Sequence, residues 1–159
     1  MKRKNLPYRK NCEGYFLYKN KYIVAKDTRK GYVVFPGGGV DSKENPKEAL
    51  IRESMEEAGI VCDNIIKKIG VLRFDWGPDW AKTRKQKKRY SKFRGEEMHF
   101  FVGTVKGFVK PKGDPSDAWK GKKYLLITDA IRLIEKTKPF DKEIEKYRIK
   151  QLKTLYSLK

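Results

Sequence analysis

The alternation of apolar runs with turn residues predicts several short strands and a few helices. Residues 15–25 are typical of a β-hairpin, because a Lys-Asn-Lys turn separates the apolar runs Tyr-Phe-Leu-Tyr and Tyr-Ile-Val-Ala. Further strands are predicted where apolar runs of strand length stand between polar segments. They cover residues 32–35, 65–76, 98–105 and, with a weaker pattern, 122–127.

Three segments have a helical pattern. In the first, Pro46 suits the first turn and Gly59 suits the C-terminal stop. A second helix is predicted over residues 128–136 with Thr128 as its N-cap, and a third over residues 141–158. Five apolar side chains fall on roughly one side of the third helix and are expected to pack inward. They are Ile144, Tyr147, Leu152, Leu155 and Tyr156.

Size and charge narrow the class of protein. A chain of 159 residues without repeats or low-complexity linkers predicts one α+β domain over residues 1–159. Its 39 Lys and Arg against 20 Asp and Glu indicate a polyanionic substrate or partner, although a lysine-rich solvated surface has the same composition. Cys12 and Cys62 show no metal-like spacing, and no apolar run reaches the length of a signal peptide or membrane span. We therefore expect a cytoplasmic protein without membrane contact.

A basic segment with aromatic neighbours lies between two predicted strands. Residues 77–95 are expected to form a loop or insertion, and eight Lys and Arg fall within residues 82–94. Positive charge beside aromatic faces is what phosphate attraction and base stacking require. A solvated mobile loop and a localisation signal are the alternatives. The candidate substrate-binding residues of this region are Lys85, Lys88, Arg89, Arg94 and Trp76.

The stretch 38–60 carries six of the 20 acids but only three of the 39 bases. On a helix, Glu53, Glu56 and Glu57 lie opposite an apolar side. Like charges at this spacing weaken a helix, so their grouping makes sense if a divalent cation binds there. Carboxylate oxygens favour Mg²⁺, with Mn²⁺ as the alternative. The opposite side, expected to pack on a sheet, consists of Leu50, Ile51, Ser54, Met55 and Ala58.

The glycines before this helix add a second feature. Pro36 is followed by three glycines at 37–39, directly after a predicted strand. Glycines without side chains let a backbone approach a ligand closely and expose its carbonyl and amide groups. A glycine run alone is more often a flexible turn. Joined to a carboxylate-bearing helix, it indicates a binding site for metal and phosphate.

The stretch resembles the Nudix box, Gly-x5-Glu-x7-Arg-Glu-U-x-Glu-Glu-x-Gly-U, in which U is a bulky apolar residue. The resemblance covers 23 of 159 residues and meets all seven fixed positions. Ile60 fits the second U, whereas Ser54 departs from the first, so we expect a small packing defect there. The resemblance implies a Nudix-type α/β/α sandwich with a mixed sheet, the box loop and helix, and a C-terminal helix.

The resemblance also implies roles for the box residues. Arg52 would orient the helix glutamates by ion pairing, and Glu44 would be an outer-shell ligand of the metal or an orienting residue. Which glutamate activates the attacking water differs among family members and stays open here. The implied metal ligands are Glu53, Glu56, Glu57 and a main-chain carbonyl of Gly37 or Gly38.

Outside the box, Glu96 and Glu97 begin a predicted strand where several Nudix enzymes place a further acid. We prefer Glu97 as a metal ligand or base, with a charged strand end as the alternative. His99 alternates with apolar neighbours on the same strand, which favours a structural role.

Taken as a family member, the chain is expected to be a Mg²⁺-dependent hydrolase. Water would attack phosphorus in a nucleoside diphosphate-linked substrate and cleave its diphosphate linkage. The alternatives are removal of phosphates from RNA 5′ ends, which the net charge favours, and a Nudix-fold module that binds RNA or a nucleotide without hydrolysis. A homodimer is a further expectation from the family.

Overall fold

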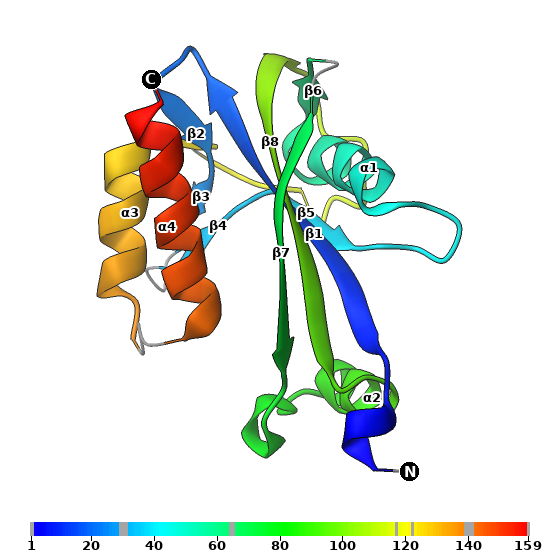
Figure 1. The fold of residues 1–159 in the computed structure, drawn as a ribbon. Coiled ribbons are helices and arrows are strands. Elements are labelled where there is room, and N and C mark those ends of the chain that lie inside the picture. The colour runs from blue at the N-terminus through cyan, green and yellow to red at the C-terminus, as the bar shows by residue number, and fades with distance from the viewer. Residues whose placement is uncertain are drawn as a thin grey trace.

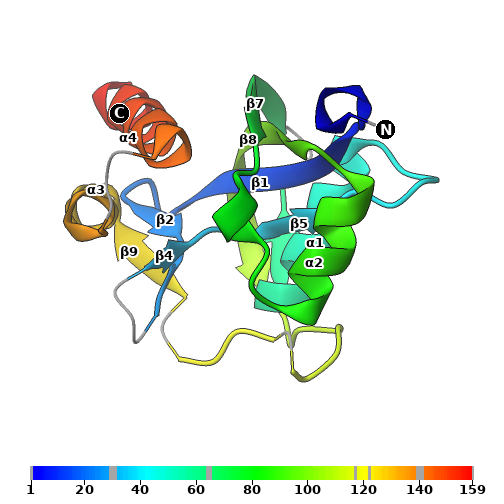
Figure 2. The same ribbon diagram turned by 90° about the horizontal axis from the view of Figure 1, so that it is seen from below.

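The fold is built around a mixed β-sheet with helices on both faces. The computed structural model describes residues 2–28, 32–63, 66–116, 118–121, 123–138 and 142–158. Its seven-stranded sheet has the strand order β6-β8-β1-β2-β9, with β5 added to β1 and β7 to β8. Helices α3 and α4 lie on one face of the sheet and α1 on the other (Figures 1 and 2). The predicted α+β sandwich with a mixed sheet and a C-terminal helix is therefore confirmed.

The elements have the following bounds. The sheet comprises β1 Tyr8–Tyr18, β2 Tyr22–Val24, β5 Gly37–Gly39, β6 Ile60–Cys62, β7 Lys67–Asp75, β8 Gly95–Phe108 and β9 Tyr124–Leu126. A separate two-stranded sheet pairs β3 Lys26–Asp27 with β4 Val33–Val34. The helices are α1 Pro46–Ala58, α2 Arg84–Lys92, α3 Ile127–Lys136 and α4 Glu143–Ser157, with short 3-10 turns η1 Arg3–Asn5 and η2 Pro78–Trp80.

The centre of the sheet is the parallel pair of β1 and β8, which are in register from Tyr8 opposite Gly95 to Leu17 opposite Thr104. Consecutive side chains on a strand point to opposite faces. Tyr15 and Phe100 therefore pack toward α3 and α4, whereas the next residue on each strand packs toward α1. Two apolar cores result, one on each face of the sheet.

The predicted strands are confirmed in place and corrected in extent. The hairpin forms, with Leu17 opposite Ile23, but its first strand begins at Tyr8 rather than at residue 15. The strand expected at 65–76 is β7, and that at 98–105 is the longer β8. Those expected at 32–35 and 122–127 shorten to β4 and β9. Residues 65 and 122 lie outside the described part of the chain.

The glycine run forms a strand that the sequence pattern did not predict. Gly37–Gly39 is β5 and pairs antiparallel with β1, Gly38 lying opposite Cys12. A Cβ on Gly37 would collide with the backbone carbonyl oxygen of Cys12, so the close pairing requires glycine there. Strand β6 was also not predicted.

The box helix begins and ends as predicted. Asn45 caps it by accepting a hydrogen bond from Glu48 N, Pro46 is its first residue, and Gly59 ends it with a φ of 64°. The prediction of its packing side is wrong at Ile51, which is 42% exposed. Ser54 is fully buried, and its hydroxyl donates to the backbone oxygen of Ile51 at 3.2 Å, so its polar group is satisfied.

Two details of the C-terminal helices correct the predictions. Thr128 lies inside α3, whose N-cap is Leu126. On α4, Tyr156 is 54% exposed, whereas the other four predicted residues pack against the core. Residue 141 lies outside the described part. No helix among the described residues is both long enough and apolar enough to cross a membrane.

The segment 77–95 was predicted to be a loop or insertion, and its prediction as a loop is wrong. It contains η2 and the nine-residue helix α2. The side chain of Thr83 accepts from Gln86 N and the side chain of Gln86 accepts from Thr83 N, which is a complete capping box. The helix has no fully buried residue, so no apolar stripe in the sequence revealed it.

A buried ion pair fastens α4 to β1. The guanidinium of Arg148 donates twice to the Glu13 carboxylate, at 2.9 and 2.6 Å, and once to Glu145 at 3.3 Å. Glu13 is only 5% exposed. Beside it, the Tyr15 hydroxyl donates to Gln151 at 2.6 Å. Removal of Arg148 would leave the buried Glu13 carboxylate without its charged partner.

We expect Arg148→Met to lower the free energy of unfolding by about 3–5 kcal/mol, because Glu13 loses its buried partner. Arg132→Met is the matched control, since Arg132 pairs with Asp129 at an exposed position and its loss should cost at most about 1 kcal/mol. Urea denaturation measures both. Equal effects of the two substitutions would contradict a buried, energetically coupled pair.

Candidate metal and catalytic site

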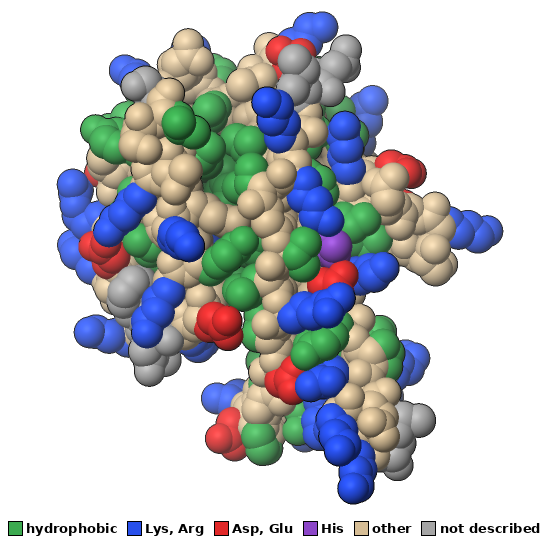
Figure 3. Space-filling view, in the orientation of Figure 1, with side chains coloured by type: hydrophobic (Ala, Val, Ile, Leu, Met, Phe, Trp, Pro, Cys, Tyr) green, Lys and Arg blue, Asp and Glu red, His purple; other side chains and the backbone are tan. Residues whose placement is uncertain are grey.

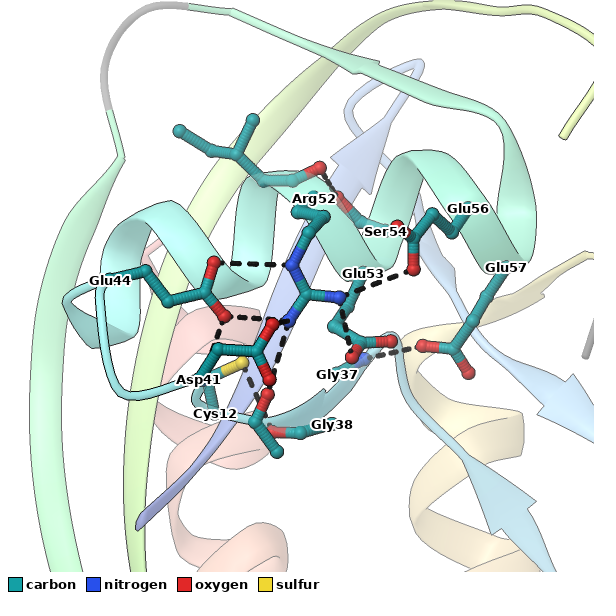
Figure 4. A network of polar contacts seen from close by, with 12 residues as sticks. Cys12, Gly37, Gly38, Asp41, Glu44, Arg52, Glu53, Ser54, Glu56 and Glu57 are labelled. Carbon is teal, nitrogen blue, oxygen red and sulfur yellow. Dashed lines mark hydrogen bonds and ion pairs between the residues drawn. The ribbon is translucent and has the colours of Figure 1, made fainter. Parts of the chain in front are cut away.

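Arg52 lies at the centre of an acidic cluster on α1. Its guanidinium donates to both carboxylate oxygens of Glu44, at 3.1 and 2.6 Å, and to Glu53 and Glu56 at 3.0 and 3.2 Å. It also donates to the backbone oxygen of Gly39 at 3.3 Å (Figure 4). One cation thus holds the loop acid, two helix acids and strand β5 together. The Arg52 side chain thus lies directly among the helix glutamates.

Local sequence explains why these groups meet. Glu44 accepts from Asp41 N at 2.9 Å, which closes the loop between β5 and α1. Asn45 then starts the helix. Arg52 and Glu56 are four residues apart and so lie on adjacent turns.

Glu57 is held by a different set of donors. One carboxylate oxygen accepts from Gly37 N at 3.3 Å, and the other accepts from the indole Nε1 of Trp119 at 3.3 Å. The backbone N of Trp119 also donates to the backbone oxygen of Glu57 at 2.8 Å. Sequence reasoning missed Trp119, because 62 positions separate the two residues and no motif connects them.

Glu53 packs directly against β5. A Cβ built on Gly38 would lie 2.7 Å from the carboxylate carbon of Glu53, so only glycine allows this approach. The backbone oxygen of Gly38 accepts from the Cys12 thiol at 3.4 Å. Burial raises the pKa of the Cys12 thiol to about 12, so this group stays protonated at neutral pH.

The acids of the cluster titrate differently. Burial raises the pKa of the Glu53 carboxyl above its ordinary value, and Arg52 opposes the rise. Hydrogen bonds from Arg52 lower the pKa of Glu44. Glu44 therefore stays charged at neutral pH and keeps Arg52 in place.

The chemistry of these donors fits a hard divalent cation. Carboxylate and main-chain carbonyl oxygens are the ligands that Mg²⁺ prefers. The Glu53 carboxylate occupies the space beside Gly38 that a side chain at position 38 would fill. Among the described residues, however, no three acidic, His or Cys side chains converge on one point, and Arg52 bonds two of the helix acids. Metal binding therefore requires these carboxylates to turn away from Arg52.

Glu97, the preferred acid outside the box, has other partners in the structure. Its carboxylate lies 2.8 Å from Arg73 Nε and 2.7 Å from His99 Nε2. Burial acts to raise its pKa, but the bonds from His99 and Arg73 outweigh burial, and the pKa lies below its ordinary value. His99 is buried and orients Glu97, in keeping with a structural role.

Glu96, the neighbouring acid, lies nearer to the glycine strand. It accepts from Asn11 Nδ2 at 2.8 Å, and Asn11 is opposite Gly39 in the sheet. Arg9 lies 3.7 Å from Glu96 and beside Gly39. Burial raises the pKa of the Glu96 carboxyl, and the positive charges of Arg9, Arg89 and Arg148 oppose the rise. Asn11 and Arg9 thus link Glu96 to Gly39, whereas Glu97 is bonded to Arg73 and His99.

A cavity of about 450 Å³ opens beside Glu96, between the sheet, η2 and the start of α4. Met98, Arg148 and two tryptophans are among its lining residues. Trp76 and Trp80 stack with centroids 3.7 Å apart and rings 3° from parallel. Trp76 is buried at 5% exposure, whereas Trp80 keeps part of its surface open.

The predicted substrate-binding residues divide into two groups. Lys85, Lys88 and Arg89 lie on α2 and form no ion pair within the described part of the chain. Arg94 instead has structural partners, donating to the Asp75 carboxylate at 3.2 and 2.9 Å and to the backbone oxygen of Lys4 at 2.8 Å.

Proteins with similar sequences point to one family. The model of the NUDIX domain family matches residues 9–147. A curated relative, the RNA pyrophosphohydrolase of a Nitratiruptor species, is 30% identical over 92 residues, which are 56% of this chain and 54% of that protein. The chain thus spans about half the length of this curated relative.

Solved structures show the same fold. A MutT structure, from work on Aliivibrio salmonicida and Vibrio cholerae, has a TM-score of 0.56 at 19% identity, covering 91% of this chain and 94% of that one. A NUDIX hydrolase from Nitrosomonas europaea has a TM-score of 0.57 at 14% identity, covering 95% and 89%. At these identities the likeness concerns the fold alone. With the family model matching most of its length and the box residues gathered around Arg52 and β5, the chain belongs to the NUDIX domain family.

Proposed function

We propose that this protein is a Mg²⁺-dependent hydrolase that cleaves the diphosphate linkage of a nucleoside diphosphate-linked substrate. One observation carries the proposal: the three box glutamates lie on one side of α1, beside the glycine strand that a Cβ would obstruct. A NUDIX domain that only binds its ligand would have little need of the complete set of box glutamates. The alternative of a non-catalytic binding module is therefore disfavoured.

Glu53, Glu56, Glu57 and the carbonyl of Gly37 or Gly38 would hold the metal. Bound there, Mg²⁺ would supply positive charge beside the diphosphate and lower the pKa of a coordinated water. The chain's own residues provide orientation. The N–H groups of Gly37 and Trp119 direct the Glu57 carboxylate toward β5.

Arg52 has two tasks in this proposal. Without substrate and metal, it neutralises Glu53 and Glu56, which would otherwise repel each other on adjacent turns. Its bidentate bond to Glu44 anchors it when those two carboxylates turn away. An α1 glutamate or Glu96 would accept the proton of the attacking water. The cavity beside Glu96, with Trp80 and Met98 in its lining, would hold the nucleoside.

RNA 5′ ends are the second candidate substrate. The net charge of +19 favours a long polyanion, and the curated relative is named an RNA pyrophosphohydrolase. A mononucleotide carries too few phosphates to account for so many cations.

Hydrolysis is expected to depend on a divalent metal, because oxygen ligands dominate the site. EDTA should abolish the release of phosphate, pyrophosphate or nucleotide from a panel of nucleoside triphosphates, nucleotide sugars, dinucleoside polyphosphates and 5′-triphosphate RNA. Addition of Mg²⁺ in excess should restore it. Full activity after thorough chelation would refute the proposal.

Glu56→Gln and Glu57→Gln should each lower kcat by at least about 10²-fold, because each removes a charged oxygen from the group that stabilises the transition state. Circular dichroism should show both variants folded. Glu135→Gln on α3, an exposed acid outside the cavity, serves as the control for loss of a single carboxylate. A folded double variant with full activity would contradict the assignment.

Gly38→Ala should displace the Glu53 carboxylate, since the new Cβ would lie 2.7 Å from its carbon. We expect kcat to fall by at least about tenfold, as even a small misplacement in an active site is costly. Gly107→Ala is the matched control, because a Cβ there meets nothing within 4 Å. Wild-type kinetics for Gly38→Ala would show that Glu53 does not need this contact.

A further inference from the structure

Helix α2 and the N-terminal turn η1 form a basic lobe at one end of the molecule. The lobe lies at the far end of β1, β7 and β8, away from α3 and α4 (Figure 1). Lys and Arg side chains gather over this end in the space-filling view (Figure 3).

The lobe is firmly attached. Arg3 donates to the backbone oxygens of Tyr90 and Phe93, at 2.7 and 3.0 Å, and its guanidinium lies 3.3 Å from the centroid of the Tyr90 ring. Arg94 N donates to the backbone oxygen of Pro7, and its backbone oxygen accepts from Trp76 N. These bonds tie the C-terminal end of α2 to η1 and to both neighbouring strands. The cations of α2 therefore project from a fixed support.

Four cations form one stripe on α2. At 100° per residue, positions 85, 88, 89 and 92 fall within about 100° of arc, on the side away from Tyr90. The stripe is about 10 Å long, from a rise of 1.5 Å per residue. Three of its side chains are exposed and Arg89 is half-buried, and none of the four forms an ion pair with another described residue. The stripe consists of Lys85, Lys88, Arg89 and Lys92.

The stripe is connected to the candidate site through the sheet. Strand β8 begins at Gly95, two residues after the C-cap of α2, and its second residue is Glu96. Glu96 lines the cavity with Trp76 and Trp80 and bonds Asn11, which is opposite Gly39 of β5. The charge of Arg89 also acts on Glu96, so neighbouring residues link the stripe to the cavity and to β5.

We propose that the basic lobe binds single-stranded RNA whose 5′ end lies in the site, with downstream phosphates on Lys85, Lys88, Arg89 and Lys92. The inference rests on the proposed function and selects RNA 5′ ends as its substrate class. Cations on a fixed support suit a backbone that carries one charge per nucleotide. The partly open Trp80 ring suits stacking of an unpaired base. An acidic peptide would use the cations but would not need the aromatic cavity.

Binding can be measured apart from hydrolysis. A fluorescent single-stranded RNA of about 20 nucleotides with a 5′-monophosphate, in EDTA, reports affinity by anisotropy over a range of salt concentrations. The variant K85Q/K88Q/R89Q/K92Q keeps good helix formers on α2. Each lost contact should reduce the slope of log K against log salt by about 0.7, so the four together should reduce it by up to about 2.8.

The matched control is K136Q/K138Q/K146Q/K150Q, which removes the same charge from the α3 and α4 side. Its slope should stay near that of the wild-type protein. Equal losses in the two variants would mean that net charge alone attracts RNA, and would overturn the proposal. Circular dichroism checks that α2 remains helical. If poly-glutamate displaces the RNA at equal charge concentration, the lobe is a general polyanion or protein site, and the RNA assignment fails.

Kinetics then separate this inference from the proposed function. With Mg²⁺, the α2 variant should lose at least about tenfold more kcat/KM on 5′-triphosphate RNA than on a nucleoside triphosphate, because only RNA reaches the stripe. Equal losses on both substrates would overturn the RNA inference while leaving the hydrolase proposal intact. Lobe-dependent RNA binding without hydrolysis of any substrate would refute the hydrolase proposal alone.

Discussion

The site depends on contact between a carboxylate-bearing helix and a strand without side chains. Glu53 can lie against Gly38 only because β5 presents bare backbone there. In the same strand, Gly37 N donates a hydrogen bond to Glu57. The absence of side chains also lets β5 pair closely with β1. A side chain at Gly37 would collide with the backbone of β1, whereas one at Gly38 would collide with the Glu53 carboxylate on α1. Gly37 therefore serves the pairing of the sheet, and Gly38 serves the contact with the helix.

Grouping acids on one side of a helix has an electrostatic cost, which Arg52 offsets. Its four carboxylate bonds reach Glu44, Glu53 and Glu56, and the pKa of Glu44 falls as a result. This neutralisation by Arg52 is confined to the site, whereas the protein as a whole carries a net charge of +19. A negative site on a positively charged protein suits a substrate that carries many negative charges and needs a metal cation at only one point.

Sequence reasoning succeeded where local rules determine structure. The box helix is bounded by a proline at its first turn and a glycine in the left-handed region, and both were readable in advance. The family assignment is confirmed for the same reason, because the box residues lie close together in sequence. The hairpin followed from its turn residues.

The failures share a different cause. The first half of β1 is polar in sequence, yet Glu13 is buried because Arg148 reaches it from 135 positions away. Trp119 likewise orients Glu57 from 62 positions away. Such long-range partners leave no periodic signal.

Because residues 84–92 form the helix α2 rather than a loop, their charges have fixed positions. The cations of a mobile loop would have no fixed positions. Binding a ligand would then have to order the loop, at a cost in conformational entropy of about 1–2 kcal/mol per residue. The structure instead caps α2 at both ends and fixes it through Arg3 and Arg94. That entropy is lost on folding, before any ligand arrives, so the cations can bind a chain in one register at lower cost. In the proposed RNA complex, a fixed register matters because a polyanion that slides would place its 5′ end beyond the reach of the box glutamates.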